Sequence, residues 1–408
     1  MARSSRRAGS RHVSPGGPAS EFVVQAARLG GHAGRPRPAA RCRRGGVVFA
    51  TLNAAANQSA GASLGICEDV CEAIGGTPIV RLRRSLGDAG AGVEVFAKLE
   101  FLNPMGSVKD RVARYLVDRA LASGSLQPGG LVIEASSGNT AMGLAMMATT
   151  RGLRCRAVVR RQPSSEKLDC LRALGDELVL VDGDLHPEHP ESYNRKARSL
   201  AAAEPGAFFP DQHNNRDNNE CHYETTAPEI WRQMEGRVDV FVGGIGTGGT
   251  VSGVGRFLKE RDPTIQVVAV DVEGSVFSRH FAALSGGPDA SAPEGRYLLE
   301  GLGDEEIIDC PEFEVFDRML QVSDAEAFLA ARELARHEAM LVGGSSGAAL
   351  WGVRQILREV PPGARVVTLF PDSGTRYLST IYNDDWLREQ GLPVSRDERG
   401  SQPAKIRS

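Results

Sequence analysis

A lysine at the start of an expected helix is the first residue whose type suggests covalent chemistry. In the segment F-L-N-P-M-G-S-V-K-D-R, a turn at Asn103, Pro104 and Gly106 leads into a helix expected over 108–123, whose first turn carries Lys109. A lysine amine condenses with aldehydes, and burial lowers its pKa toward the range in which the free amine exists. Alone the motif is weak, because a lysine at a helix start is usually solvated. Its weight comes from three further motifs.

The segment E-A-S-S-G-N-T, residues 134–140, lies between an expected strand and an expected buried helix. Small hydroxyl and amide side chains, together with the free backbone N–H groups of a helix N-terminus, make a site for a carboxylate or a phosphate. A capping turn explains part of the pattern, because Ser137 or Asn139 would cap the helix. One cap does not require so many consecutive polar and glycine residues.

Two glycine-rich segments also follow strand-like stretches and open helices. In G-G-I-G-T-G-G-T, residues 243–250, glycines let the backbone direct N–H groups at a phosphate, and threonine hydroxyls add donors. No lysine follows the glycines, and nothing nearby is arranged for a second phosphate, so a phosphate monoester fits better than a pyrophosphate. In L-V-G-G-S-S-G, residues 341–347, a serine hydroxyl could face a ring nitrogen, and an N-cap role explains it equally well.

These motifs need a fold in which helices begin where strands end. From about residue 65, short β-branched stretches alternate with amphipathic or apolar helices, which predicts an α/β fold with parallel sheets covered on both faces. The expected strands are 93–99, 131–134, 156–160, 178–181, 238–243, 266–272 and 365–369. The expected helices are 108–123, 140–151, 165–174, 250–261, 324–337 and 346–360. Residues 277–300 lack periodicity and are expected to form a long surface loop.

Composition excludes several classes of protein. The chain has 408 residues, enough for two domains, and 41% of them are hydrophobic, as in an ordinary globular protein. No apolar stretch reaches the roughly 18 residues of a membrane span, and the net charge of -3 suggests no nucleic-acid partner. Seven scattered cysteines make no disulfide framework. Cys67 and Cys71 have no second ligand pair nearby, so we expect no metal site.

The first 64 residues differ from the rest in composition. Residues 1–50 hold ten arginines and one acid, Glu21, and we expect 1–64 to be a disordered basic extension. A transit peptide, an upstream start codon chosen in error and a solvated tail all fit this composition. We therefore expect a cytoplasmic protein, or a mitochondrial or plastid one if the extension is a transit peptide. Residues 391–408 are expected to fray.

In this order and spacing, the four motifs resemble those of the fold type II pyridoxal-5′-phosphate (PLP) enzymes of the cysteine synthase and cystathionine β-synthase family. The resemblance runs over residues 74–387. It implies two parallel-sheet α/β domains, as in the β-subunit of tryptophan synthase, with the cofactor between them, and a homodimer. The large PLP-binding domain would comprise 65–112 plus 222–390, and the smaller, mobile substrate-binding subdomain would comprise 113–221.

The resemblance also implies roles for individual residues. Lys109 would hold PLP as a Schiff base, Asn139 would bind the ring hydroxyl, and Ser345 would face the pyridine nitrogen. The cofactor phosphate would be bound by Gly246, Thr247, Gly248, Gly249 and Thr250. The substrate would be bound by Ser136, Ser137, Gly138, Thr140, Gln212 and, at the mouth of the site, Gly301.

The framework resembles cystathionine β-synthase most, so we expect replacement of the β-substituent of L-serine, or of an O-activated serine, by the thiol homocysteine. Cysteine synthase chemistry with O-acetylserine or O-phosphoserine and sulfide is the alternative. An amine nucleophile and a catalytically silent protein are less favoured. In each enzymatic case the partners are small amino-acid and nucleophile substrates.

Three positions depart from the family pattern. Ala135-Ser136 replaces the usual Pro-Thr, His213 replaces an aromatic residue after Gln212, and an aromatic residue found in some synthases is Asp304 here. By the resemblance, His213 and Asp304 approach the side of the second substrate. The identity of the leaving group and of the nucleophile is therefore open.

Overall fold

The computed structural model describes residues 65–87, 90, 92–136, 138–160, 165–175, 177–182, 185, 189–286 and 295–397. The predicted extension over 1–64, Ser137 and residues 398–408 of the predicted tail lie outside this part of the chain. Among the helices that are described, none combines the length and the apolar character that crossing a membrane requires.

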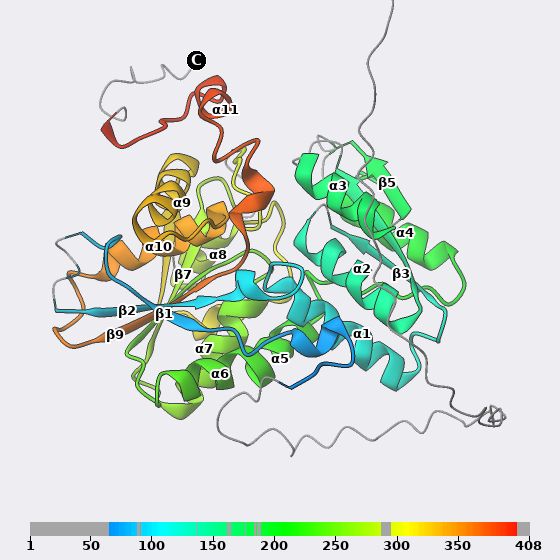
Figure 1. The fold of residues 1–408 in the computed structure, drawn as a ribbon, viewed down its shortest axis with the longest axis horizontal. Coiled ribbons are helices and arrows are strands. Elements are labelled where there is room, and N and C mark those ends of the chain that lie inside the picture. The colour runs from blue at the N-terminus through cyan, green and yellow to red at the C-terminus, as the bar shows by residue number, and fades with distance from the viewer. Residues whose placement is uncertain are drawn as a thin grey trace, which may run out of the picture. The chain divides into compact units, whose positions relative to one another are not determined.

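One sheet of the fold has six strands (Figure 1). They run in the order β1-β2-β9-β6-β7-β8, and all neighbours are parallel except β1 and β2. The inner strands are rich in valine and are buried on both faces, as parallel strands between helical layers require. The strands are β1 Ile79–Leu82, β2 Glu94–Leu99, β6 Val240–Gly244, β7 Gln266–Val272, β8 Arg318–Val322 and β9 Arg365–Phe370.

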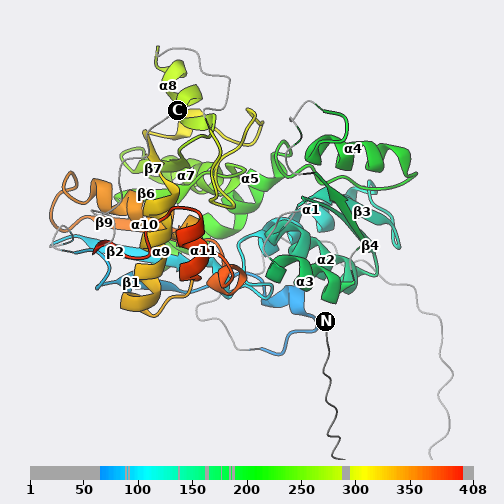
Figure 2. The same ribbon diagram turned by 90° about the horizontal axis from the view of Figure 1, so that it is seen from above.

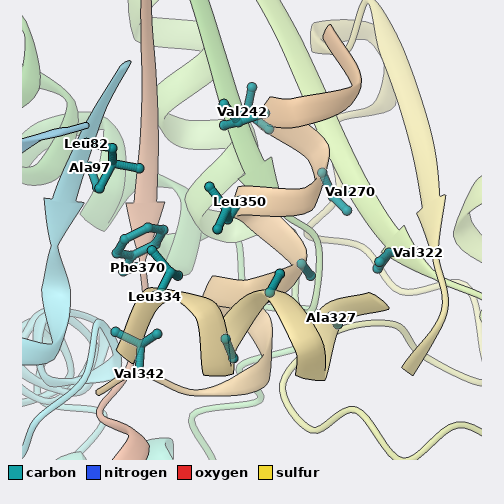
Figure 3. Packing of buried hydrophobic residues seen from close by; sticks show 14 of the residues in the cluster. Leu82, Ala97, Val242, Val270, Val322, Ala327, Leu334, Val342, Leu350 and Phe370 are labelled. Atoms are coloured by element: carbon teal, nitrogen blue, oxygen red, sulfur yellow. The ribbon is translucent and has the colours of Figure 1, made fainter. Parts of the chain in front are cut away.

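One face of this sheet is covered by α9 (Asp324–Glu338) and α10 (Gly344–Ile356). Leu334 of α9 and Leu350 of α10 belong to the same buried cluster as Val242 of β6 (Figure 3). The side chains of a strand alternate between its two faces, so the neighbouring Phe241 points to the opposite face. There it joins a second buried cluster with α6 Ala227–Gln233, α7 Gly249–Arg261 and α8 Phe277–Leu284.

A second sheet has three parallel strands in the order β3-β4-β5. Helices α1, α2 and α3 pack on one of its faces and α4 packs on the other (Figure 2). This sheet falls within the predicted smaller subdomain, whose boundaries and mobility stay predictions. The elements are β3 Leu131–Ala135, β4 Arg154–Arg160, β5 Glu177–Val181, α1 Lys109–Ser123, α2 Asn139–Arg151, α3 Ser165–Leu174 and α4 Tyr193–Ala203.

The predicted strands and helices all occur, with ends that differ by a few residues at most. The sequence missed β1 and β8, which are short strands at the two edges of the six-stranded sheet and are only partly buried. The prediction of a continuous loop over 277–300 is wrong, because α8 occupies its start. Phe277 and Phe281, four positions apart, share a helix face and pack into the core, which stabilises this helix.

The carboxyl edge of the six-stranded sheet brings the motifs together. Strands β2, β9 and β6 are parallel neighbours, so the segments that follow them start at the same edge. Lys109 follows β2, Asp372 follows β9 and the glycine turn 245–248 follows β6. Between β5 and β6 the chain also forms α4, α5 (Asp217–Cys221), a π-helical turn (His222–Thr226) and α6.

Candidate active site

Lys109 is the first residue of α1, and its amine reaches the glycine turn. The hydroxyl of Ser107 accepts the Lys109 backbone N–H at 3.2 Å, which fixes the start of the helix. Lys109 Nζ lies 3.5 Å from Oγ1 of Thr247. Burial lowers the pKa of Lys109, so the neutral amine is more accessible here than in water. The structure therefore brings the predicted lysine and a predicted phosphate-binding residue together.

A buried ion-pair cluster anchors the first turn of α1. Arg111 Nε lies 2.7 Å from Oε2 of Glu100, and Arg111 Nη2 lies 2.7 Å from Oε2 of Glu229. Lys98 on β2 also pairs with Glu229, at 2.7 Å. Burial opposes ionisation of Glu229, but its two cationic partners outweigh burial and lower its pKa to about 2. These contacts hold Lys109, two residues before Arg111, in a fixed position at the sheet edge.

The tight conformation and close packing of the glycine turn require residues without side chains. Gly248 has a φ of +81°, the left-handed region that favours glycine. A Cβ at Gly249 would come 2.3 Å from Oδ1 of Asn218, and one at Gly246 would come 2.3 Å from the carbonyl oxygen of Gly301. Helix α7 begins at Gly249, and the first N–H groups of a helix have no partner within it. These features suit the phosphate monoester of PLP.

Two buried side chains that the sequence analysis missed support this turn. Asn218 donates through Nδ2 to Thr247 Oγ1 at 3.0 Å and to the carbonyl of Gln212 at 2.9 Å. Its Oδ1 is buried without a hydrogen-bond partner in the described structure. His222 Nε2 lies 3.1 Å from Oγ1 of Thr250, and burial lowers the pKa of His222 well below its usual value, so it is neutral. The polar stretch D-N-N-E-C-H was the only signal in the sequence.

The loop before α2 combines a cap with exposed donors. Oγ of Ser136 accepts the backbone N–H groups of Gly138 at 3.3 Å and of Ala141 at 3.1 Å. Ser136 thus supplies the oxygen that the capping-turn interpretation expects from Ser137 or Asn139, and Gly138 is the N-cap residue. The assignment to Asn139 is wrong because that residue is already inside the helix. The hydroxyl hydrogen of Ser136 stays free to be donated to a carboxylate.

Thr140 and Gln212, both predicted to bind substrate, are in contact. The hydroxyl of Thr140 donates to Oε1 of Gln212 at 2.5 Å. The backbone N–H of Gln212 donates to the buried carboxyl of Glu134 at 3.2 Å. The Gln212 amide nitrogen donates one hydrogen to the carbonyl of Ala135 at 3.4 Å and keeps its second hydrogen as a donor for a ligand. The two segments, more than 70 residues apart, form one polar wall.

Asn139 is held in one orientation by two charged residues that the sequence analysis did not select. Its Nδ2 donates to Oδ2 of Asp372 at 2.8 Å, and its Oδ1 accepts a hydrogen bond from the guanidinium of Arg376. A guanidinium only donates and a carboxylate only accepts, so the amide cannot flip. Nδ2 keeps a second hydrogen for a ligand, as the predicted contact with a ring hydroxyl requires.

Ser345 lies in the first turn of α10 and is 5% exposed. Among the described residues its hydroxyl makes no hydrogen bond. Two positions earlier, a Cβ at Gly343 would lie 2.0 Å from Oδ1 of Asp372, so the serine loop and the Asn139 region meet at this carboxylate. Among the described residues, the Ser345 hydroxyl is therefore unpaired and makes no hydrogen bond with Lys109. That it faces the cofactor ring nitrogen stays a prediction.

Lys167 joins α3 to the mouth of the site. Its Nζ donates to Oε2 of Glu300 at 2.5 Å and to the hydroxyl of Tyr377 at 3.3 Å. The hydroxyl of Tyr377 donates in turn to Asp372 at 2.6 Å. Gly301, predicted to line the mouth, follows Glu300 and has a φ of +85°. Sequence spacing offered no sign of this link, because its members come from three separate segments.

Two of the three departures from the family pattern, His213 and Asp304, are hydrogen-bonded to each other. Nδ1 of His213 lies 3.0 Å from Oδ2 of Asp304, and their side chains are 22% and 15% exposed. Burial alone would lower the pKa of His213, but the hydrogen bond and the charge of Asp304 outweigh burial and raise it.

Within the described residues, no cluster of three or more metal-ligating side chains occurs.

Comparison with known proteins agrees with this geometry. A family model described as "Pyridoxal-phosphate dependent enzyme" matches residues 70–372. Cystathionine beta-synthase of Apis mellifera is 39% identical over 335 residues, which are 82% of this chain and 65% of that protein. Cystathionine beta-synthase of Rattus norvegicus is 38% identical over 329 residues, which are 80% of this chain and 57% of that protein. The chain thus spans less than two thirds of the length of these two relatives.

Two shorter proteins match over their full length. Cysteine synthase of Staphylococcus aureus is 39% identical over 320 residues, which are 78% of this chain and 98% of that protein. The crystal structure of an O-acetylserine-dependent cystathionine beta-synthase from Helicobacter pylori has a TM-score of 0.71 at 36% identity. It covers 78% of this chain and all of that one.

The match and the fold agree on one family. The predicted α/β fold of the type II PLP enzymes is confirmed by the matched family and by the similar solved structure. The prediction that the cofactor is PLP is confirmed at the level of the family, because the matched family depends on pyridoxal phosphate. The chain belongs to the pyridoxal-phosphate-dependent enzymes of the cysteine synthase and cystathionine β-synthase type.

Proposed function

We propose that this chain catalyses a PLP-dependent β-replacement, in which a thiol takes the place of the β-substituent of L-serine or of an O-activated serine. The observation that carries the proposal is the position of the Lys109 amine, 3.5 Å from Thr247 in the anion-binding turn. An amine with a lowered pKa beside a phosphate cradle is what an aldehyde cofactor with a phosphate arm needs.

The residues around Lys109 would hold the cofactor in four places. Lys109 would bind it covalently, the turn 246–250 would bind its phosphate, Asn139 would bind its ring hydroxyl and Ser345 would face its ring nitrogen. When bound, PLP supplies a ring that stabilises negative charge at the α-carbon of an amino acid. A serine at the ring nitrogen donates no full proton, so the ring is a milder electron acceptor, which favours loss of the β-substituent over transamination.

The polar wall beside α2 would bind the substrate carboxylate. Ser136 contributes a hydroxyl donor and Gln212 an amide N–H, while Thr140, whose hydroxyl hydrogen is donated to Gln212, orients that amide. The N-terminus of α2 adds backbone donors. With the carboxylate fixed, the α-hydrogen of the substrate is directed at one base.

Lys109 Nζ is that base in our proposal. Once released from the cofactor, the amine takes the α-proton and later returns it to the same carbon. Its lowered pKa keeps the amine neutral at a pH where a solvated lysine is charged. The β-substituent leaves and the thiol adds between these two proton transfers.

Among the thiols, homocysteine is our first choice, which makes the chain a cystathionine β-synthase. Relatives bearing that name match this chain, and the solved relative from Helicobacter pylori is described as O-acetylserine dependent, which favours an activated serine as the donor. Cysteine synthase activity is the second candidate, supported by the relative from Staphylococcus aureus that matches over 98% of its length.

Product identification by mass spectrometry separates these candidates. The holoenzyme would be given serine, O-acetylserine or O-phosphoserine, each with homocysteine or with sulfide. Cystathionine as the main product supports our first choice, and cysteine supports the second. An amine nucleophile would be offered in a third arm. No product in any arm would contradict the proposed reaction and would leave the silent protein as the better account.

We also propose a homodimer in the cytoplasm, as the resemblance and composition suggested. Sedimentation equilibrium tests the first point. Localisation of the full chain, with and without residues 1–64, tests whether the basic extension directs it to a mitochondrion or a plastid instead.

A further inference from the structure

The His213–Asp304 pair lies at the edge of the site and has a defined chemical form. His213 follows Gln212, which is bonded to Thr140, and Asp304 follows the 300–303 loop. The pair is bonded through Nδ1 of the imidazole at 3.0 Å. Because a carboxylate only accepts, Nδ1 carries the hydrogen and Nε2 of the neutral ring has a lone pair. Among the described residues, Nε2 has no hydrogen-bond partner.

Asp304 is itself held in place, so the pair is rigid. Its backbone N–H donates to Oγ of Ser275 at 3.2 Å, and its Oδ1 accepts the backbone N–H of Glu305 at 2.7 Å. Its Oδ2 is then directed at His213. Asp304 also borders a small polar pocket together with Arg160 and Tyr193.

Besides Asp304, two ionisable groups act on the imidazole, and the thiol of Cys310 lies on a residue that contacts the His213 backbone. The carboxyl of Glu134 on β3 supports the charged form of His213, and the Lys109 amine on α1 opposes it. Cys310, whose N–H donates to the carbonyl of His213, has a thiol whose pKa burial raises to about 12, so it stays neutral. Asp304 is the dominant charged partner. The pKa of His213 is raised above its usual value, so the neutral imidazole is a stronger base than a solvated histidine.

We propose that His213, oriented by Asp304, is the general base that takes the proton from the incoming thiol. This inference rests on the proposed β-replacement and adds a residue to its second half. As the S–H bond breaks, its electron pair forms the new bond from sulfur to the β-carbon of the first substrate, and the proton passes to Nε2 of His213. The β-substituent has by then left with its own electron pair, and Lys109 returns the α-proton. His213 releases its proton to solvent before the next cycle.

A base is needed because a free thiol is mostly protonated at neutral pH. The reference pKa of a cysteine thiol is about 8.5, so only a few per cent is thiolate at pH 7. Lys109 carries the α-proton at this stage and is charged, so it cannot accept a second one. His213 is the base available on the side of the second substrate.

The test compares His213→Gln and Asp304→Asn with His337→Gln, an exposed histidine on α9 that serves as the control. The first half of the reaction, in which the β-substituent leaves, is followed by the change in the cofactor spectrum when O-acetylserine or serine is added alone. The second half, in which the thiol adds, is followed in a single turnover by the return of the spectrum to that of the resting enzyme. If the wild type shows no spectral change with the first substrate, the proposed β-replacement itself is contradicted. A normal first half lets the second half test the base alone.

We expect His213→Gln to keep the first half and to slow the second about 100-fold with homocysteine. Thiols of low pKa are already ionised and should recover most of this loss. In the wild type, the rate of the second half should rise with pH as His213 loses its proton. His213→Gln should lack this rising limb of the pH–rate profile. In Asp304→Asn, the pKa of His213, measured by NMR on ¹⁵N-histidine-labelled protein, should fall and the limb should move to lower pH.

An equal loss with all thiols, an unchanged pH limb, or a rise in KM with kcat unchanged would make the pair a binding element and overturn the proposal. An unshifted His213 pKa in Asp304→Asn would also overturn it, because the dyad would then not exist in solution.

Discussion

The Nζ atom of Lys109 and the Oγ1 atom of Thr247 lie 3.5 Å apart, although the two residues are 138 positions apart in the sequence. The parallel strands β2, β9 and β6 create this proximity by ending at one edge of the sheet. One lysine and one glycine turn thereby form a site that neither could form alone.

Adding a methyl group to the phosphate turn should weaken cofactor binding. In Gly249→Ala the new Cβ would meet Asn218 Oδ1 at 2.3 Å, and Asn218 also orients Thr247. We expect PLP affinity to fall by at least about tenfold, or roughly 1.4 kcal/mol. Fluorescence titration of apoenzyme measures it. In Gly295→Ala the Cβ would meet no described residue within 4 Å, so this control should bind normally. Equal affinity in all three proteins would contradict the assignment of the turn.

Removing the Lys167 amine should weaken the link between α3 and the mouth of the site. Lys167→Met loses the bonds to Glu300 and Tyr377, and bonds to charged groups contribute about 1.5–3 kcal/mol. We expect the first substrate to bind about tenfold more weakly and to protect residues 113–221 less from protease. Arg172→Met, which removes an exposed ion pair from the same helix, is the control. Identical protection in both variants would argue against closure through Lys167.

The buried carboxyl of Glu134 should make stability depend on pH. Burial raises its pKa to about 7, from a reference value of 4.5. Between these two values the native chain keeps a proton that the unfolded chain has released, so the contribution of this group to stability falls as pH rises. It is fully present below about pH 4.5 and is lost above about pH 7.

Glu134→Gln cannot ionise, so it should lack this part of the pH dependence. The glutamine loses one acceptor for the N–H groups of Ala135 and Gln212, so its melting temperature should be lower at acidic pH. The gap between wild type and variant should narrow from about pH 5 to pH 8. A constant gap over this range, measured by thermal denaturation, would show that Glu134 is ionised throughout.

The parts of the site that the sequence predicted have local causes. The glycine turn could be predicted because five glycines among the seven residues 243–249 rarely serve a plain helix start. Lys109 could be predicted because its motif precedes a regular amphipathic helix. The six predicted helices followed from hydrophobic periodicity, whereas α4, α5, α6 and α8 were not predicted. The edge strands β1 and β8 were missed because short, partly exposed strands show little alternation.

The parts that were missed depend on contacts between distant segments. Asn218 beneath Thr247, Asp372 beside Asn139 and Lys167 on Glu300 each join residues that no spacing rule connects. His213 and Asp304 were noticed separately, as two departures from a family pattern, 91 positions apart. Only the fold makes them one pair, and this is why the sequence left the nucleophile open and the structure suggests how it is activated.

Covalent trapping tests the central claim most directly. The holoprotein would be reduced with borohydride, digested and analysed by mass spectrometry. We expect one pyridoxyl adduct, on Lys109, with Lys98 and Lys167 unmodified, and we expect Lys109→Ala to lose both the adduct and the visible absorption band. A protein that takes up no PLP when it is supplied, or that carries the adduct on another lysine while Lys109 stays free, would contradict the account.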